Sequence, residues 1–538
     1  MNRTVGPQSV TDVLPASQHG ALCARPRRSL RLDARHRLRG AVVRATREVA
    51  SRCGLVLLVT VTSVSTVQAQ TTVVAAAKAN DGPAVTSLIA RGRDVNVPQP
   101  DGATSLHWAS YWDSGEIAAR LLDAGADVNA ANDYGVTPLA LACENASGAM
   151  VARLLNKGAN PNVPRSTGET PLMTCARTGG LAAVDALLAH GADANAAEPA
   201  HGQTALMWAA GEGHAEVVRR LLAGGAEVQV RTTGGYTALL IAARTDTPGL
   251  AGLLLNAGAD VNAGAPDGTT PLLVATVRGH ADLAIALLER GADPNASAGY
   301  TALHFASGAW HTELTGRLRG IETERDEEWR SMNEVRVGKV RLVEALLAHG
   351  ADVDARVVRP PPQFGYASGR FRVGLVGATA FLLAAMDADV DAMRALAAAG
   401  ADTQASTDEH TTPIMVAAGL GQVPAETQVT QAEALAAVRL SLELGADVNQ
   451  VNQSGRTALH GAAHIRSDRV VQVLVDHGAR LDVEDERGIT PLMIAEGGGH
   501  VLLPGLGGGT TSDLLIALGA SRTAASDSTD IYSQGAIR

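Results

Sequence analysis

At 538 residues the chain is longer than one hydrophobic core usually supports, which indicates several domains or a repeat array whose core extends along one axis. Apolar residues make up 46% of the chain and aromatic residues only 3%, so Ala, Leu and Val must supply most of the packing. Residues 1–70 hold 11 of the 45 basic and three of the 55 acidic groups, which leaves 34 basic and 52 acidic groups and a net charge of −18. Such a surface repels phosphate backbones and anionic lipid, so outside a local basic patch we expect no nucleic acid partner and no binding to a membrane face.

The first segment of the chain has the features of a secretory signal peptide. Arg47 and Arg52 precede an apolar run at 54–67, and the tripeptide VQA at 67–69 offers small residues where cleavage takes place. The run is too short and too rich in Thr and Ser for a transmembrane helix, so we expect no stable membrane anchor. We expect a leader at 1–69 and a chain exported to the periplasm or secreted. Because the stretch upstream of these arginines is long for a signal peptide, a later translation start and a cytoplasmic chain with an unused signal are the alternatives.

From residue 101 onward a repeating pattern organises the chain. It is close to GxTPLxxAA, followed by a second apolar helix with LL and the turn GADxNA. The threonine that opens each unit stands at 104, 137, 170, 204, 237, 270, 301, 379, 412, 457 and 490, so most steps are 33 residues. A period of this length indicates stacked helix-turn-helix units. Because neither helix of a unit can bury its apolar side alone, neighbouring units must stabilise one another.

The unit at 267–296 shows how the local sequence specifies two helices. Thr270 can cap the first helix, and Pro271 takes the first helical position, where its missing N–H costs nothing. The second helix, around 281–290, ends at Gly291, which can adopt the left-handed cap conformation. The side chains that we expect to face the neighbouring units are Leu272, Ala275, Leu283, Ile285, Leu287 and Leu288.

These units resemble the ankyrin repeat. Its inner-helix signature is present as TSLHWAS (104–110), TALMWAA (204–210), TALHFAS (301–307) and TALHGAA (457–463). The resemblance covers roughly 72–520 and implies an all-α ankyrin-repeat solenoid of about 11 to 12 helix-turn-helix units with hairpin loops, closed by a degenerate unit at each end. It also implies a non-catalytic scaffold that binds a partner protein on the concave face, which hairpin tips and inner helices form.

Long steps between opening threonines mark insertions. We divide the chain into the leader, repeats at 70–307, a charged insertion at 308–340, repeats at 341–520 with inserted loops at 356–377 and 421–433, and a disordered tail at 521–538. The loop at 356–377 gathers Arg and aromatic side chains, which often anchor interfaces, so we expect a second partner contact there; the alternative is a loop that only packs on the solenoid. Its candidate residues are Phe364, Tyr366, Arg370, Phe371 and Arg372.

The family resemblance places the main partner contact on positions that vary between repeats. Those that follow the inner helices are Tyr111, Trp112, Glu144, Asn145, Arg177, Glu212, Arg244 and Arg278, and those in the hairpins are Tyr134, Tyr236 and Tyr300. For each one the alternative is an ordinary exposed residue. Trp108, Trp208 and Phe305 recur at one inner-helix position that other units fill with Leu, Val or Ile, so we expect them to pack inside the array.

Catalytic and cofactor motifs are absent from the sequence. His460 and His464 stand four apart, but the Glu of the HExxH metal motif is missing, and His460 fills the same ankyrin position as His107 and His304. The glycine-rich stretch at 505–512 lacks the Lys of a phosphate-binding loop. We therefore expect a monomer with no cofactor, no metal and no enzymatic activity. An enzyme, or an enzyme-associated module, with a site in the insertions and a structural spacer without a specific partner are the rival classes.

Two cysteines lie beyond the leader. Cys143 and Cys175 fall near matching places of neighbouring repeats, in the row of small residues of the inner helix. Buried, chemically inert thiols are the simpler interpretation, and a disulfide between them is the alternative.

Overall fold

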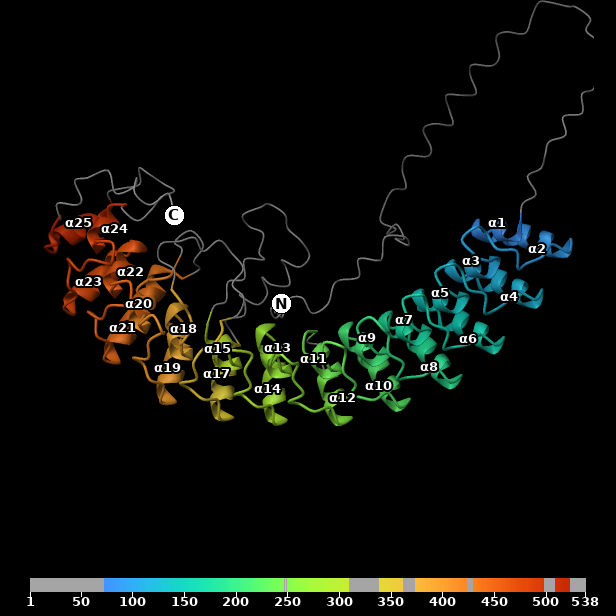
Figure 1. The fold of residues 1–538 in the computed structure, drawn as a ribbon, viewed down its shortest axis with the longest axis horizontal. Helices are drawn as coiled ribbons and strands as arrows, with labels where there is room; N and C mark the ends of the chain where they lie inside the picture. Colours follow the sequence, from blue (N-terminus) through green and yellow to red (C-terminus); the bar gives the residue numbers. More distant parts are fainter. Residues whose placement is uncertain are drawn as a thin grey trace, which may run out of the picture.

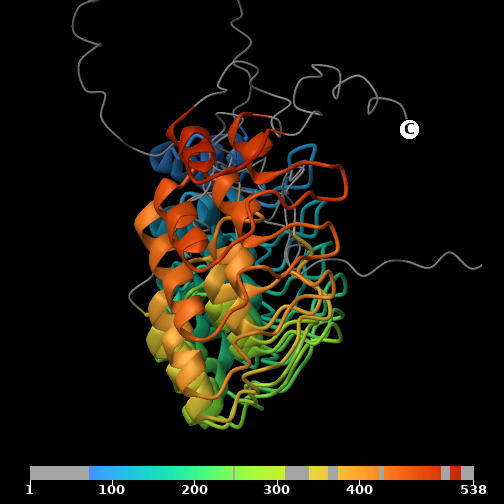
Figure 2. The same ribbon diagram turned by 90° about the vertical axis from the view of Figure 1, so that its left-hand side faces the viewer.

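The computed structural model describes residues 72–245, 247, 249–308, 338–360, 373–422, 429–497 and 509–522. Over these residues the chain forms helix pairs that stack side by side into a curved array, running from one end of the arc to the other (Figure 1). Seen from the end, the helices form two layers and the hairpin loops project to one side (Figure 2). These ranges contain one isolated β-bridge, between Ala197 and Thr204, and no β-strand. The predicted all-α repeat solenoid is confirmed.

Each pair has an inner helix on the concave side of the arc and an outer helix on the convex side (Figure 1). The inner helices are α1 (Val73–Lys78), α3 (Ser105–Tyr111), α5 (Pro138–Glu144), α7 (Pro171–Arg177), α9 (Ala205–Gly211), α11 (Ala238–Ala242), α13 (Pro271–Val277), α15 (Ala302–Ser307), α18 (Ala380–Met386), α20 (Pro413–Ala417), α22 (Ala458–His464) and α24 (Pro491–Ala495). The outer helices are α2 (Gly82–Ala90), α4 (Gly115–Asp123), α6 (Gly148–Asn156), α8 (Leu181–Ala189), α10 (Ala215–Ala223), α12 (Leu250–Asn256), α14 (Ala281–Glu289), α17 (Lys339–Ala348), α19 (Val390–Ala398), α21 (Gln431–Glu443), α23 (Asp468–Asp476) and α25 (Thr510–Ala517). The described residues thus contain twelve pairs, within the expected number, and α1–α2 and α24–α25 are the two degenerate end units.

The helix boundaries of the unit at 267–296 follow from its capping residues. The hydroxyl of Thr270 accepts a hydrogen bond from the backbone N–H of Leu273 at 3.2 Å, and Pro271 is the first residue of α13, as predicted. Gly291, just beyond α14, has φ +87° and turns the chain away from the helix. The side chains predicted to face the neighbouring units are either buried (Leu272, Ala275, Leu287, Leu288) or half-buried against the continuous core (Leu283, Ile285).

Three buried histidines join an inner helix to the next repeat. The backbone N–H of Thr104 donates to Nδ1 of His107 at 3.0 Å, so Nε2 carries the proton and donates to the carbonyl oxygen of Val136 at 2.9 Å. His304 and His460 make the same two kinds of bond. Burial lowers the pKa of all three rings, and that of His460 to about 4. The folded array therefore holds these rings neutral, and their role is structural.

The array should lose stability as the pH falls from about 6.5 to about 4. Above this window His460 is neutral in both states; within it the unfolded chain binds a proton that the folded ring does not accept. For His460 the free energy of unfolding should fall by about 1.4 kcal/mol per pH unit within this window, and the lowered pKa values of His107 and His304 act in the same direction. Urea unfolding at about pH 7.5 and about pH 5 measures this effect. His460→Gln should reduce the pH dependence, while His349→Gln, at an exposed position, should not. An unchanged slope in His460→Gln would contradict the assignment.

A ladder of asparagine side chains on the hairpin side also links successive repeats. The side-chain amide of Asn129 donates to the carbonyl oxygen of Gly158 at 3.1 Å, and its Oδ1 accepts from the backbone N–H of Asn160 at 2.8 Å. The residues that make both bonds to the next repeat are Asn96, Asn129, Asn162, Asn195, Asn262, Asn295 and Asn449. Gln229, Asp354, Gln404 and Asp482 occupy equivalent places and make one such bond. The repeats are thus joined outside the core as well as within it.

The ends of two predicted insertions are helical. The outer helix α17 begins at Lys339, so the last residues of the predicted 308–340 insertion belong to the array. The outer helix α21 begins at Gln431 behind the capping residue Thr430, which shortens the predicted loop at 421–433 in the same way. The leader and most of the insertion residues and tail lie outside the described residues. No helix within the described ranges is long and apolar enough to cross a membrane.

Candidate functional site

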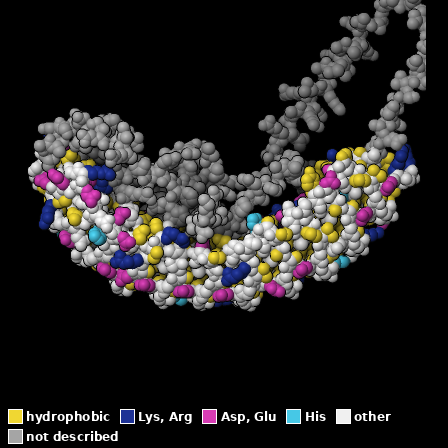
Figure 3. Space-filling view, viewed as in Figure 1, with side chains coloured by type: hydrophobic (Ala, Val, Ile, Leu, Met, Phe, Trp, Pro, Cys, Tyr) yellow, Lys and Arg dark blue, Asp and Glu magenta, His cyan; other side chains and the backbone are white. Residues whose placement is uncertain are grey.

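Accessible side chains of the inner helices are concentrated in the amino-terminal half of the array. Every residue of α20, α22 and α24 is buried. In contrast, α3, α5, α7 and α9 leave side chains near their carboxyl ends half-buried, and the residues directly after α3 and α9 are exposed. Hydrophobic side chains are visible along the concave edge over α1 to α5 (Figure 3). A partner on the concave face would therefore meet these helix ends first.

Three aromatic rings form a cluster, here called the aromatic cluster, at the end of α3. Trp108 and Tyr111 meet edge to face with ring centroids 5.6 Å apart, and Tyr111 meets Trp112 in the same manner at 5.0 Å. Trp112 is 44% exposed although its Nε1 donates to the carbonyl oxygen of Lys78 at 3.0 Å. The ammonium of Lys78 lies 4.9 Å from the centre of the Trp108 ring, and the indole N–H of Trp108 donates to Gln99 at 3.2 Å. The rings are held by specific contacts rather than left free to rotate.

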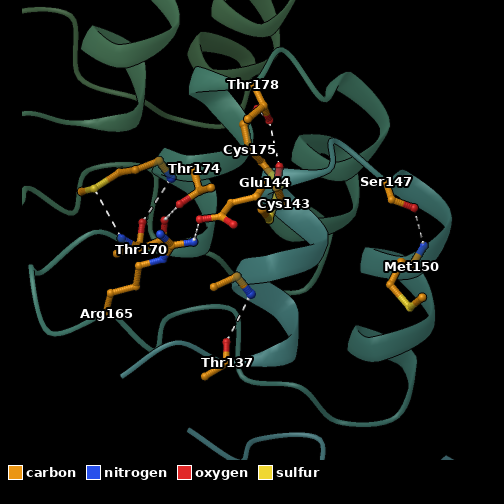
Figure 4. Close-up of a disulfide and its surroundings, with 12 residues drawn as sticks. Thr137, Cys143, Glu144, Ser147, Met150, Arg165, Thr170, Thr174, Cys175 and Thr178 are labelled. Atoms are coloured by element: carbon orange, nitrogen blue, oxygen red, sulfur yellow. Dashed lines mark hydrogen bonds and ion pairs between the residues drawn. A yellow bond between two sulfur atoms is a disulfide. The ribbon is translucent and has the colours of Figure 1, made fainter. Parts of the chain in front are cut away.

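Two predicted contact residues on α5 and beside it act within the chain. The side-chain amide of Asn145 donates to the carbonyl oxygens of Ser110 at 2.9 Å and Tyr111 at 3.0 Å, so it positions the aromatic cluster. Glu144 forms an ion pair with Arg165 at 2.6 Å, and Arg165 reaches it from the hairpin before α7 (Figure 4). The charge of Glu144 is therefore compensated on the concave face. Arg165 was not among the predicted residues, because a hairpin position carries no signal of how far its side chain reaches.

Farther along the concave face, Arg177 covers an indole ring of the next repeat. Its guanidinium lies 5.4 Å from the centre of the Trp208 ring. Nε of Arg177 and Nε1 of Trp208 are buried and have no acceptor among the described residues. Arg244 and Arg278 are half-buried at the ends of the following inner helices, and Glu212 is exposed. On this face a cation lies over an indole ring at two places, Lys78 over Trp108 and Arg177 over Trp208.

The predicted hairpin tyrosines differ in accessibility. Tyr134 is 61% exposed at a hairpin tip. Tyr236 is half-buried, and burial raises its pKa to about 12. Tyr300 is only 5% exposed and its ring lies 6.3 Å from that of Phe305, so it packs within the array, and its partner contact stays a prediction. Trp108 and Phe305 pack against the core as expected.

The two cysteines beyond the leader form a disulfide. Cys143 in α5 and Cys175 in α7 are both fully buried, and their Cα atoms are 4.6 Å apart (Figure 4). The interpretation as free thiols is therefore corrected. The sequence separation of the two cysteines is 32, one less than the repeat period of 33. They are therefore offset by one residue on adjacent helices, which brings their sulfur atoms together.

The second predicted contact lies outside the described residues. Phe364, Tyr366, Arg370, Phe371 and Arg372 all fall in 361–372. At the edge of this segment, the guanidinium of Arg359 donates to the carbonyl oxygen of Ala298 at 2.8 Å. Among the described residues there is no group of three His, Cys, Asp or Glu side chains that could hold a metal ion.

Comparison with known proteins gives matches along most of the chain. The description "Ankyrin repeats (3 copies)" matches residues 56–132, 72–165, 113–198, 139–232, 195–265, 216–298, 239–323 and 428–503, and "Ankyrin repeat" matches 298–357. Potassium channel AKT1 of Oryza sativa subsp. indica is 39% identical over 59 residues, which are 11% of this chain and 6% of the channel. Neurogenic locus notch homolog protein 1 of Homo sapiens is 31% identical over 141 residues, 22% of this chain and 6% of that protein. The chain spans a small part of the length of these relatives.

Proposed function

The chain belongs to the ankyrin-repeat family, and on this basis we propose that it is a non-catalytic scaffold that binds a partner protein through the concave face of its solenoid. Ankyrin repeats in general mediate protein–protein interaction. The observation that carries the proposal is the aromatic cluster, whose outermost ring, Trp112, is 44% exposed in a chain with few aromatic residues. Large rings held rigidly at a surface are typical anchors of protein interfaces.

The surroundings of the aromatic cluster support this role. Lys78 and Asn145 fix the backbone and the ring positions before any partner arrives, so little side-chain entropy is lost on binding. A structural spacer has no need for such an arrangement on its accessible face. The rival enzyme class places its site in the insertions, most of which lie outside the described residues.

Changing both Tyr111 and Trp112 to Ala should weaken partner binding at least about tenfold, or roughly 1.4 kcal/mol. The partner can first be captured by a photoreactive benzoylphenylalanine placed at position 112, and its affinity for the variants then measured by calorimetry. Ile516→Ala, which removes an exposed apolar side chain from α25, is the matched control and should change nothing. Crosslinking from position 516 but not from 112, or full affinity in the double variant, would move the site elsewhere.

We also propose that the chain is exported by means of its leader and acts as a monomer, both on the basis of the sequence. Amino-terminal sequencing of the exported protein should give a start near Gln70. An intact leader on a cytoplasmic protein would contradict export, and light scattering would detect a dimer.

A further inference from the structure

Two exposed carboxylates lie in the turns beside the outermost ring of the aromatic cluster. Asp113 follows Trp112 directly in the turn between α3 and α4, and Asp81 lies in the corresponding turn between α1 and α2. The indole N–H of Trp112 reaches back to the carbonyl oxygen of Lys78, shortly before Asp81 in the sequence. Asp81 and Asp113 are here called the turn carboxylates. Building on the proposed function, we propose that the partner presents a basic segment, with one cationic side chain stacked on the ring of Trp112 and its charge facing the turn carboxylates.

The turns between inner and outer helices carry no Lys or Arg in the first five repeats. These turns are residues 79–81, 112–114, 145–147, 178–180 and 212–214. Their carboxylates are Asp81, Asp113 and Glu212, and their one histidine, His214, bonds to the carbonyl oxygen of Arg177 at 3.0 Å. Beyond residue 70 the chain has 34 basic and 52 acidic groups, so the field of the whole array also attracts a basic partner.

Lys78, the cation in contact with the aromatic cluster, is already engaged within the chain. Its ammonium lies 4.9 Å from the centre of the Trp108 ring. The backbone N–H of Ala103 lowers the pKa of Asp101 by a hydrogen bond, and the charge of Lys78 acts in the same direction. The carboxylate of Asp101 therefore offsets the charge of Lys78, which leaves the turn carboxylates to a partner.

The turn carboxylates form no ion pair among the described residues, although their neighbours do. The neighbouring acids that are paired are Glu116 with Arg120 at 2.8 Å and Glu144 with Arg165 at 2.6 Å. One oxygen of Asp81 accepts a hydrogen bond from the backbone N–H of Ala84 at 2.9 Å, and within the described part of the chain no donor reaches the carboxylate of Asp113. A cationic side chain of the partner would pair with charges that the array itself leaves uncompensated.

The other tryptophans of the described residues show that rings on this face bind cations. Lys78 lies over Trp108, and the guanidinium of Arg177 lies 5.4 Å from the centre of the Trp208 ring. Trp112 is the third of these tryptophans; it is 44% exposed, and no cation of the described residues lies over its ring. An apolar side chain on this ring would gain nothing from the turn carboxylates, and an acidic one would be repelled by them. A cation is attracted by both the ring and the carboxylates, so we favour it.

The test uses a fluorescent Gly-Ser peptide that carries four arginines as the probe and the same peptide with glutamates in their place as its counterpart. The chain should bind the arginine peptide at least about tenfold more tightly, and binding should weaken as salt is added. The double variant Asp81→Asn and Asp113→Asn should lose at least about fivefold in affinity for the arginine peptide. Asn keeps the helix-capping oxygen at position 81 and tolerates the φ of +53° at position 113, so the fold should be retained.

A control double variant removes the same charge elsewhere. Glu289→Gln and Asp391→Asn change exposed residues of the outer helices α14 and α19, and this variant should bind nearly as the wild type does. Two replacements of Trp112 test the ring. Trp112→Leu keeps an apolar side chain without a ring face and should lose at least about threefold in affinity, whereas Trp112→Phe keeps an aromatic face and should lose less. Circular dichroism verifies that all variants are folded.

Four outcomes would overturn the inference. They are equal binding of the two peptides, equal losses in the two double variants, unchanged affinity in Trp112→Leu, and tighter binding of the small cation spermine than of the arginine peptide. The proposed function is judged separately, by crosslinking from position 112. A partner protein that crosslinks there and keeps its affinity for the Asp81 and Asp113 variant would leave the proposed function standing and refute the basic segment. Binding of the arginine peptide that depends on Trp112 and the turn carboxylates, with no protein crosslinked at 112, would refute the proposed function instead.

Discussion

Replacing Leu287 by Ala should lower the free energy of unfolding by about 2 to 5 kcal/mol. Leu287 is fully buried in α14, where the outer helix packs against α13 and α17. Removing its side chain takes away apolar contacts and leaves a cavity that rigid neighbouring helices fill only in part. Because each repeat contacts only the repeats beside it, the repeats around Leu287 should open first, before the whole array unfolds. Hydrogen exchange of the amides in α13 to α17 measures the local loss of stability directly. Urea unfolding measures the loss in the free energy of unfolding of the whole array.

Leu283→Ala is the matched control for this experiment. Leu283 lies in the same helix but is only half-buried, so the same chemical change should cost clearly less. A loss below about 0.5 kcal/mol for Leu287→Ala would show that α14 is not packed as described. Faster exchange spread evenly over distant repeats would instead show that the array unfolds as one cooperative unit.

Removing the disulfide by the double change Cys143→Ala and Cys175→Ala should cost about 3 to 4 kcal/mol. The bond closes a loop with a sequence separation of 32 and so restricts the unfolded chain. Both residues are fully buried between α5 and α7, so the effect should concentrate in the repeats around these helices. These repeats adjoin the aromatic cluster, and their loosening should also weaken partner binding. Thermal unfolding with and without dithiothreitol measures the contribution.

The double variant supplies its own control for the reductant. Dithiothreitol should lower the melting temperature of the wild type and leave that of the variant unchanged. Alkylation of the unfolded, unreduced protein followed by mass spectrometry counts the free thiols. Two modified thiols at Cys143 and Cys175, or the same response to reductant in both proteins, would contradict a stabilising disulfide.

Much of the fold could be predicted because its determinants are local and recur. Thr270, Pro271 and Gly291 each specify a helix end through their own backbone preferences, and the repeat spacing then places every other helix. The aromatic cluster was predictable in part, since Tyr111 and Trp112 follow the helix that the pattern defines. What the pattern does not contain is how far a side chain reaches between repeats.

Tyr300 and Arg165 show this limit. Tyr300 stands directly before its capping threonine, a position that is buried at Ala103, Ala378 and Ile489 but half-buried at Val136, Glu169, Gln203 and Tyr236. Comparing equivalent positions of the repeats therefore does not decide whether Tyr300 is buried. Comparing equivalent positions of the repeats does not predict that Arg165 extends to Glu144 of the preceding repeat, because this contact depends on the distance between a hairpin and a helix end.

The asparagine ladder determines where the array would part under mechanical load. Each side chain of the ladder and its hydrogen bonds to the next repeat form one rung. At a rung with two bonds, such as that of Asn295, both bonds must break before the hairpins separate. Asp354 has no side-chain N–H to donate, and it makes one bond, from the backbone of Asp402; Gln404 on the next repeat also makes one, to the carbonyl oxygen of Leu444. These two weaker rungs are consecutive. A stretched solenoid would therefore yield first around α18 and α19, like a spring with one soft coil, and would leave the aromatic cluster intact.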